Sequence, residues 1–347
     1  MEAADEFGYV CSKVHGVAYP GFVQEPVVDE LLSRFTLRND DIVIATFPKC
    51  GTTWMQQIVL SLLYGGDTSK VKDCFYQAPW IEWVTGFKFL GGGPDMNGKL
   101  MSVDELSAWD GDTEYGPGPG RRVFKTHAPV ALAPWQGGVD SLKGTGTKVI
   151  VVVRNPKDAC VSYFHHVQEV PEFQYTGSFE HMASKLYAKE KVEDGGFWSW
   201  YSGWEKAAAE NPNIHWVSYE QLKRDGFSAV RDVANFLGLT VADDVIVSAL
   251  TAADFSAMKL QHSKLDEIKK EQGKYIKPGH FRQGLSGSWR NVIHGDLDKE
   301  FTAAHEYYVE KYGIRHEFDF GDDPAKPVME PAKPVIEADT YSVCCGA

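Results

Sequence analysis

The chain is short of cysteine, of positive charge and of long apolar runs, and each shortage excludes a class of protein. Six cysteines among 347 residues, with no C-x-x-C pair, indicate neither a disulfide framework nor a zinc site. A formal net charge of -13 argues against a nucleic-acid groove. Apolar runs such as Val149–Val153 are only as long as a strand, and Met1–Glu6 is acidic, so neither a membrane span nor a targeting peptide is expected. These absences favour a cytoplasmic protein.

The composition that is present suits one compact domain. Hydrophobic residues make up 43% of the chain, enough to bury a sizeable core. We expect a single domain over residues 1–320. The remaining stretch, 321–347, holds the near-repeat Pro324–Glu330 and Pro331–Glu337, rich in proline and charge, which predicts a disordered tail.

The most informative segment is Ile42–Trp54. A β-branched run leads into a turn with Pro48, Lys49 and Gly51, and then into paired threonines at a helix start. Such a turn presents backbone N–H groups and a helix N-terminus to an anion, and the lysine adds a full positive charge. The segment therefore predicts a P-loop-like phosphate-binding strand, loop and helix.

Further strands alternate with helices along the chain. Arg122–His127, Lys148–Val153 and Ile214–Glu220 each read as a strand, and the second runs into a helix from about Ala159. This order predicts an α/β fold with a central parallel sheet flanked by helices. Because ligands of such sheets lie outside the carboxyl ends of the strands, four side chains should converge at one edge: Lys49, His127, Arg154 and Tyr219.

Several of these segments together resemble the motif series of the cytosolic sulfotransferases. The matching segments, in the family's order, are Phe47–Trp54, Lys125–His127, Val153–Asp158 with Ser162 and Tyr163, Tyr219–Glu220, Phe255 with Met258, and Phe281–Gly284 with Trp289. The resemblance implies transfer of a sulfuryl group from 3'-phosphoadenosine 5'-phosphosulfate to a hydroxyl or amine of a small acceptor. The product is then 3',5'-adenosine bisphosphate, and no metal is implied.

The resemblance also implies a role for each matching residue. His127 matches the catalytic base, and an imidazole with an ordinary pKa near ~6.5 accepts a proton at neutral pH. Lys49 and Lys125 match residues that stabilise charge in the transition state. The nucleotide is held by the remaining matches: Lys49, Cys50, Gly51, Thr52 and Thr53 around the 5'-phosphosulfate; Trp54, Tyr219, Phe255 and Met258 around adenine; Arg154 and Ser162 at the 3'-phosphate; and Phe281, Arg282, Gln283 and Gly284 in a closing loop.

Three positions depart from the family's usual residues. Gln283 stands where a lysine is usual, Ser288 stands where an aspartate usually precedes the tryptophan, and Cys50 replaces a frequent serine. Loss of one positive charge near a phosphate predicts weaker donor binding, by about 1 kcal/mol. A thiol at a helix N-terminus could also be acidified and sensitive to oxidation.

The acceptor site is the least specified part. Trp80 and Trp83 match the place of aromatic acceptor walls, and His166 joins them, although ordinary core packing explains the same residues. Such walls suit a flat or hydrophobic alcohol or phenol, while Glu82 with His166 would suit a polar or cationic group. The stretch Lys264–Lys277 reads either as a lid near the donor phosphates or as a solvated helix face.

Two other functions fit parts of the pattern. A P-loop kinase shares the cradle, but the chain lacks G-x-x-x-x-G-K-[ST] and a clear strand-end aspartate for magnesium. A catalytically silent nucleotide-binding or scaffold protein is the second alternative, and the presence of both Lys125 and His127 weighs against it. Arg290–Gly295 does not reproduce the family's dimerisation stretch, which favours a monomer or a non-standard homodimer.

Overall fold

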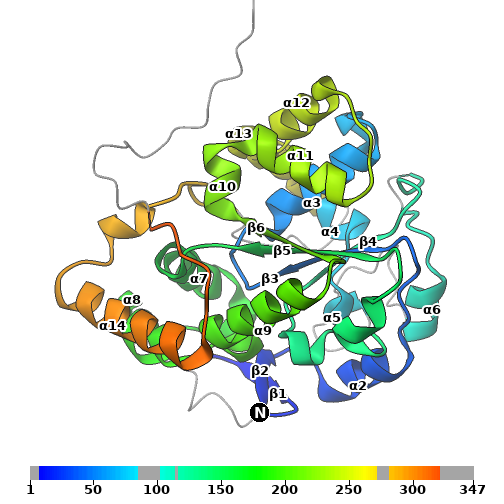
Figure 1. Cartoon of the computed structure of the whole chain (residues 1–347). Helices are drawn as coiled ribbons and strands as arrows, with labels where there is room; N and C mark the ends of the chain where they lie inside the picture. Colours follow the sequence, from blue (N-terminus) through cyan, green and yellow to red (C-terminus); the bar gives the residue numbers. More distant parts are fainter. Residues whose placement is uncertain (1–7, 85–101, 114–115, 272–280, 321–347) are drawn as a thin grey trace, which may run out of the picture.

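A four-stranded parallel sheet forms the centre of the molecule (Figure 1). The computed structural model describes residues 8–84, 102–113, 116–271 and 281–320. The strands are β3 (Ile42–Thr46), β4 (Val123–Thr126), β5 (Lys148–Val153) and β6 (Ile214–Ser218), in the order β4-β3-β5-β6. All three pairings are parallel. The predicted α/β class with a central parallel sheet is confirmed.

Helices cover both faces of this sheet. On one face lie α3 (Thr52–Leu63), α10 (Tyr219–Arg224), α11 (Gly226–Phe236), α12 (Asp243–Ala252) and α13 (Phe255–Glu271). The other face carries α7 (Pro156–Glu169), α9 (Phe197–Glu210) and α14 (Gly295–Tyr312), with the short helices α2 (Glu25–Arg34) and α5 (Ile81–Val84) toward the β4 edge. Around them lie a hairpin of β1 (Cys11–Val14) and β2 (Val17–Pro20) and the short helices α4 (Cys74–Gln77), α6 (Val103–Ala108) and α8 (Phe179–His181).

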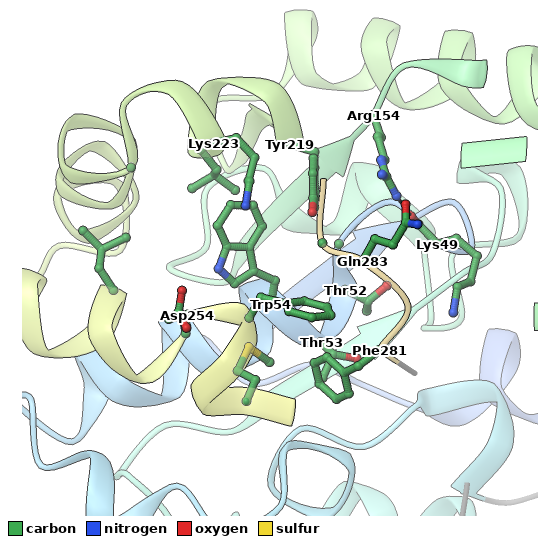
Figure 2. A pocket seen from close by; sticks show the side chains of 18 of the residues that line it. Lys49, Thr52, Thr53, Trp54, Arg154, Tyr219, Lys223, Asp254, Phe281 and Gln283 are labelled. Atoms are coloured by element: carbon green, nitrogen blue, oxygen red, sulfur yellow. Dashed lines mark hydrogen bonds between the residues drawn. The ribbon is translucent and has the colours of Figure 1, made fainter. Parts of the chain in front are cut away.

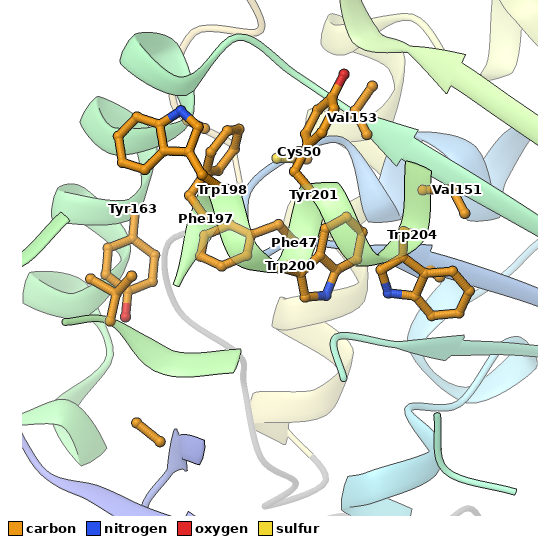
Figure 3. Packing of buried hydrophobic residues seen from close by; sticks show 14 of the residues in the cluster. Phe47, Cys50, Val151, Val153, Tyr163, Phe197, Trp198, Trp200, Tyr201 and Trp204 are labelled. Carbon is orange, nitrogen blue, oxygen red and sulfur yellow. The ribbon is translucent and has the colours of Figure 1, made fainter. Parts of the chain in front are cut away.

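A hydrophobic core lies on each face of the sheet, because side chains alternate between the two faces along each strand. Val149, Val151 and Val153 of β5 point into one core, whereas Ile150 and Val152 point into the other. The first core is aromatic where α9 packs beneath the sheet, as Figure 3 shows for Phe197, Trp198, Trp200, Tyr201 and Trp204. A strand buried on both faces explains the pure Val/Ile sequence of β5.

Two predicted boundaries were wrong. Helix α7 begins at Pro156 and not at about Ala159, because the Asn155 side chain caps it by accepting from the Asp158 N–H at 2.8 Å. Strand β6 ends at Ser218, whose hydroxyl accepts from the Gln221 N–H at 3.0 Å, so Tyr219 and Glu220 start α10.

The predicted tail 321–347 lies outside the described residues. Within the described parts of the chain, no helix has the length and apolarity needed to cross a membrane.

Candidate functional site

A cavity of about 830 Å³ opens at the carboxyl ends of the strands. It contains the four side chains that were expected to converge there, Lys49, His127, Arg154 and Tyr219. Further predicted site residues in its wall are Gly51, Thr52, Thr53, Trp54, Lys125, Ser162, His166, Phe255, Met258, Phe281, Arg282, Gln283 and Gly284 (Figure 2). Cys50, Trp80 and Trp83 do not line it. Segments far apart in the sequence thus build one site.

The loop between β3 and α3 has the geometry of an anion cradle. Lys49 and Gly51 both adopt positive φ angles, 69° and 108°. A side chain at Gly51 would place its Cβ 3.0 Å from the Tyr219 ring, so both the backbone angle and the close approach require glycine there. Gly51 is the N-cap of α3 and brings no side-chain acceptor to the helix start. The first-turn N–H groups of α3 therefore have no side-chain cap, and the first three residues of the helix, Thr52, Thr53 and Trp54, line the cavity, as an anion site requires.

Arg154 ties the cradle to the loop that follows residue 280. Its Nη1 donates to the Lys49 carbonyl at 3.2 Å and its Nη2 to the Leu285 carbonyl at 2.8 Å, while the guanidinium lies 4.4 Å from the centre of the Tyr219 ring. The buried Nε atoms of Arg154 and Arg282 have no hydrogen-bond partner among the described residues. Both arginines line the cavity, and two guanidinium groups at one cavity fit a phosphate or sulfate group.

His127 is held in one tautomer. Its Nδ1 lies 2.8 Å from the Thr46 carbonyl, which can only accept, so Nδ1 carries the proton of the neutral ring. The lone pair is then on Nε2. The backbone on either side is also fixed, because the His127 N–H donates to Glu82 Oε1 at 3.1 Å and the Trp200 indole N–H donates to the His127 carbonyl at 2.9 Å. The ring can therefore accept a proton through Nε2 without moving.

Thr46, at the end of β3, links the base to the cradle and was missed from the sequence. Its Oγ1 lies 3.2 Å from His127 Nδ1 and 2.6 Å from Thr52 Oγ1. The Thr46 and Thr52 hydroxyls hydrogen-bond to each other, and either of them can be the donor, so Thr46 connects His127 to the first residue of α3. The signal was available, since Thr46 is the only polar residue in Ile42–Thr46 and it stands at the strand end that faces ligands.

The far end of the cavity is a flat aromatic slot. The Trp54 and Tyr219 rings meet edge to face at 5.0 Å, and Lys223 Nζ lies 5.6 Å from the centre of the Trp54 ring (Figure 2). Gly284 packs so closely that a Cβ there would lie 2.4 Å from the Phe255 ring. Lys223 and Asp254 also line the slot and were missed. Lys223 follows Tyr219 by four residues, so placing Tyr219 in a helix would have found it.

Trp80 and Trp83 form an aromatic cluster beside His127. The Trp80 and His127 rings lie 4.8 Å apart, and Phe22 and Phe75 pack against the two tryptophans. Glu82 does not face an acceptor, contrary to the alternative raised from the sequence. It is fully buried, and its Oε1 accepts from the Thr126 hydroxyl at 2.6 Å and from the His127 and Ala128 N–H groups at 3.1 Å. The Glu82 carboxylate thus accepts the hydrogen bonds of the groups at the carboxyl end of β4.

One more sequence interpretation was wrong. The Cys50 thiol is not acidified, since burial raises its pKa well above the usual range and its side chain packs into the aromatic core (Figure 3). Of the stretch Lys264–Lys277, residues 264–271 are described, and none of these lines the cavity. Lys269 Nζ pairs with Asp73 at 2.7 Å, which fastens the end of α13 to the segment before α4, and residues 272–280 lie outside the described residues.

Comparison with known proteins gives one consistent result. A family model described as "Sulfotransferase domain" matches residues 39–313. Sulfotransferase 1 family member D1 of Rattus norvegicus is 30% identical over 286 residues, which cover 81% of this chain and 85% of the relative. Amine sulfotransferase of Oryctolagus cuniculus is 26% identical over 85% of this chain and 89% of the relative.

Solved structures agree on the fold. Mouse sulfotransferase SULT7A1 complexed with PAP superposes with a TM-score of 0.63 at 22% identity, covering 86% of this chain and 95% of that one. Retinol dehydratase in complex with androsterone and inactive cofactor PAP gives a TM-score of 0.66 at 16% identity, covering 90% of this chain and 93% of that one. At these identities the likeness concerns the fold.

Proposed function

The chain belongs to the sulfotransferase family, and from this premise we propose that it moves a sulfuryl group from 3'-phosphoadenosine 5'-phosphosulfate (PAPS) to a hydroxyl or amine of a small aromatic or hydrophobic acceptor. The observation that carries the proposal is the shared cavity. It joins a histidine with a fixed tautomer, an anion cradle with a lysine, and a separate pair of arginines. A donor with phosphate groups at two positions needs both anion sites.

The proposed reaction is an in-line displacement at sulfur. The acceptor oxygen or nitrogen forms a bond to sulfur while the bond from sulfur to the 5'-phosphate oxygen breaks, and His127 Nε2 takes the acceptor's proton. The leaving phosphate gains negative charge, which Lys49, Lys125 and the first-turn N–H groups of α3 are placed to stabilise. The product 3',5'-adenosine bisphosphate (PAP) keeps the phosphates and the base.

The acceptor class is inferred from the aromatic cluster that packs beside His127, next to the cavity but not in its wall. Buried Trp80 and Trp83, with the partly buried Phe22 and Phe75 packed against them, form this cluster. The Trp80 ring contacts His127, and Lys125 Nζ lies 4.9 Å from the centre of the Trp80 ring. Such a surface favours a flat or apolar group whose hydroxyl points at Nε2. Oε1 of Glu82 is already bonded to the Thr126 hydroxyl and to the His127 and Ala128 N–H groups, and Glu82 does not line the cavity, which favours an uncharged acceptor.

A sulfation assay with PAPS and a panel of phenols, steroids, alcohols and amines tests the proposal. We expect PAPS-dependent transfer to apolar phenols or alcohols in preference to charged amines. ATP turnover without sulfate transfer would favour a small-molecule kinase instead. Tight PAP binding without turnover of any acceptor would favour a silent nucleotide-binding protein.

Donor affinity should fall as pH rises above 8. Burial lowers the pKa of Lys49 to about 8; the negative charge of Glu169 raises this pKa, and the positive charges of Arg154 and Arg282 lower it further. The free protein therefore loses the Lys49 charge between pH 7 and pH 9. Only the charged form attracts the 5'-phosphate. Calorimetric titration with PAP at pH 7.0 and 9.0 measures the fall, and Lys49→Arg is the control because a guanidinium stays charged. An equally steep fall in the variant would rule Lys49 out as the titrating group.

Gln283→Lys should tighten donor binding about 5-fold. Gln283 lines the cavity beside Arg154 and Lys49 (Figure 2), and a positive charge there adds roughly 1 kcal/mol toward a phosphate. Gln283→Glu is the matched control of opposite sign and should weaken binding. Calorimetry with PAP compares the three proteins, and an unchanged or weaker affinity for Gln283→Lys would contradict the expectation.

A further inference from the structure

The side chain of half-buried Arg282 is held by Ser288. Its Nη2 donates to Ser288 Oγ at 3.2 Å, and Ser288 Oγ donates to Asp158 Oδ1 at 3.1 Å. Ser288 is 4% exposed and Asp158 is fully buried. The serine hydroxyl has one proton and two lone pairs, so it can accept from the arginine and donate to the carboxylate at the same time.

Asp158 in turn fixes the backbone of this loop. Its Oδ2 accepts from the Gly287 N–H at 2.6 Å and its Oδ1 from the Trp289 N–H at 2.9 Å. Asn155 Nδ2 donates to the same carboxylate at 2.9 Å. Asp158 lies in the first turn of α7, the helix that also carries Ser162 into the cavity. The carboxylate therefore fastens the loop with Arg282 to the helix with Ser162.

A neutral anchor leaves the charge of Arg282 available. An aspartate at position 288 would stand beside the buried Asp158 carboxylate, where two like charges repel, and it would also pair with Arg282 and compete with any incoming anion. The serine avoids both effects. The Nε of Arg282 has no hydrogen-bond partner among the described residues, and the Arg282 side chain lines the same cavity as Arg154.

We propose that Ser288 is a positioning residue that orients Arg282 toward the 3'-phosphate of the donor and so sets the preference for 3'-phosphorylated nucleotides. This inference rests on the proposed function, because it takes the donor to be PAPS. It adds a residue outside the cavity wall, acting through Arg282. With Gln283 uncharged, the orientation of Arg282 matters more for this phosphate than it would beside a second cation.

The test compares PAP with 5'-AMP, which has the same base and 5'-phosphate but no 3'-phosphate. Calorimetry, by competition for the weaker ligand, gives both affinities. Ser288→Ala should lower the affinity for PAP about 5-fold and leave that for 5'-AMP within 2-fold, since one hydrogen bond to a charged group is lost. Ser288→Thr keeps the hydroxyl and should behave like wild type. Ser288→Asp should lose more PAP affinity than Ser288→Ala because it neutralises Arg282.

A double-mutant cycle separates positioning from general damage. In an Arg282→Ala background, Ser288→Ala should have no further effect on PAP binding. An equal loss for both ligands, or the same loss with and without Arg282, would overturn the inference. If Ser288→Ala fails to fold, the comparison uses Ser288→Asp and Ser288→Thr only. Identical PAP affinities for these two variants would overturn the inference about Ser288. A wild-type protein that does not prefer PAP over 5'-AMP would instead refute the donor assignment itself.

Discussion

His127→Ala is expected to lower kcat by about 10²- to 10⁴-fold, the range that a general base contributes. The physical reason is the fixed tautomer. Thr46 holds the Nδ1 proton at 2.8 Å, so Nε2 is the nitrogen that receives the acceptor's proton, and alanine offers no replacement. PAP affinity should change little because the phosphates meet other residues. Steady-state sulfation kinetics and calorimetry with PAP measure the two quantities.

His294→Ala is the matched control for this change. His294 is exposed before α14 and does not line the cavity, so its loss should leave kcat unchanged. A His127→Ala protein that kept near-normal turnover would show that the base lies elsewhere. A large parallel loss of PAP binding would show that His127 holds the donor rather than the acceptor's proton.

The second large effect is expected from Arg154→Ala, which should weaken PAP binding by about two orders of magnitude or more. Truncating a buried charge that pairs with another charge costs about 2–5 kcal/mol. Arg154 also joins the Lys49 and Leu285 carbonyls, so both anion sites loosen when it is removed. At saturating donor, kcat should fall much less than the affinity. Calorimetry measures the affinity for PAP, and PAPS-dependent kinetics measure kcat.

Arg154→Lys distinguishes charge from shape. Lysine keeps the positive charge but has no fork to span the two carbonyls and a phosphate, so we expect an intermediate loss. Exposed Arg315 lies outside the cavity wall, and Arg315→Ala should bind PAP as wild type does. Equal affinities for the wild type and Arg154→Ala would remove Arg154 from the donor site.

Much of the donor side could be predicted from the sequence because it is built from local signals. A Val/Ile strand, a glycine in a turn and a hydroxyl at a helix start each report on neighbouring residues only. Since parallel strands end at one edge, Lys49, His127 and Arg154 could be placed together before any coordinates. The family assignment, drawn from the order of these motifs, is confirmed by the matched domain over 39–313.

For Glu82 and Cys50, the contact that decides the outcome is remote in the sequence. Glu82 was predicted, as one alternative, to contact the acceptor, but its Oε1 accepts from the N–H of His127, which lies 45 residues away. Cys50 was predicted to be reactive, but burial in the core raises its pKa. Helix α7 starts early through its Asn155 cap, a local signal that the hydrophobic pattern concealed.

The sequence by itself determined that a phosphate cradle, a basic strand end and an arginine after a buried strand belong to one sulfotransferase-type site. Only the tertiary structure decided how the side chains are held: which nitrogen of His127 carries the proton, that Thr46 joins the base to the cradle, and that Ser288 anchors Arg282. Local patterns fix where a strand or helix ends. The direction of a hydrogen bond depends on partners that lie 81 residues apart for Thr46 and His127, and these meet only in the folded chain.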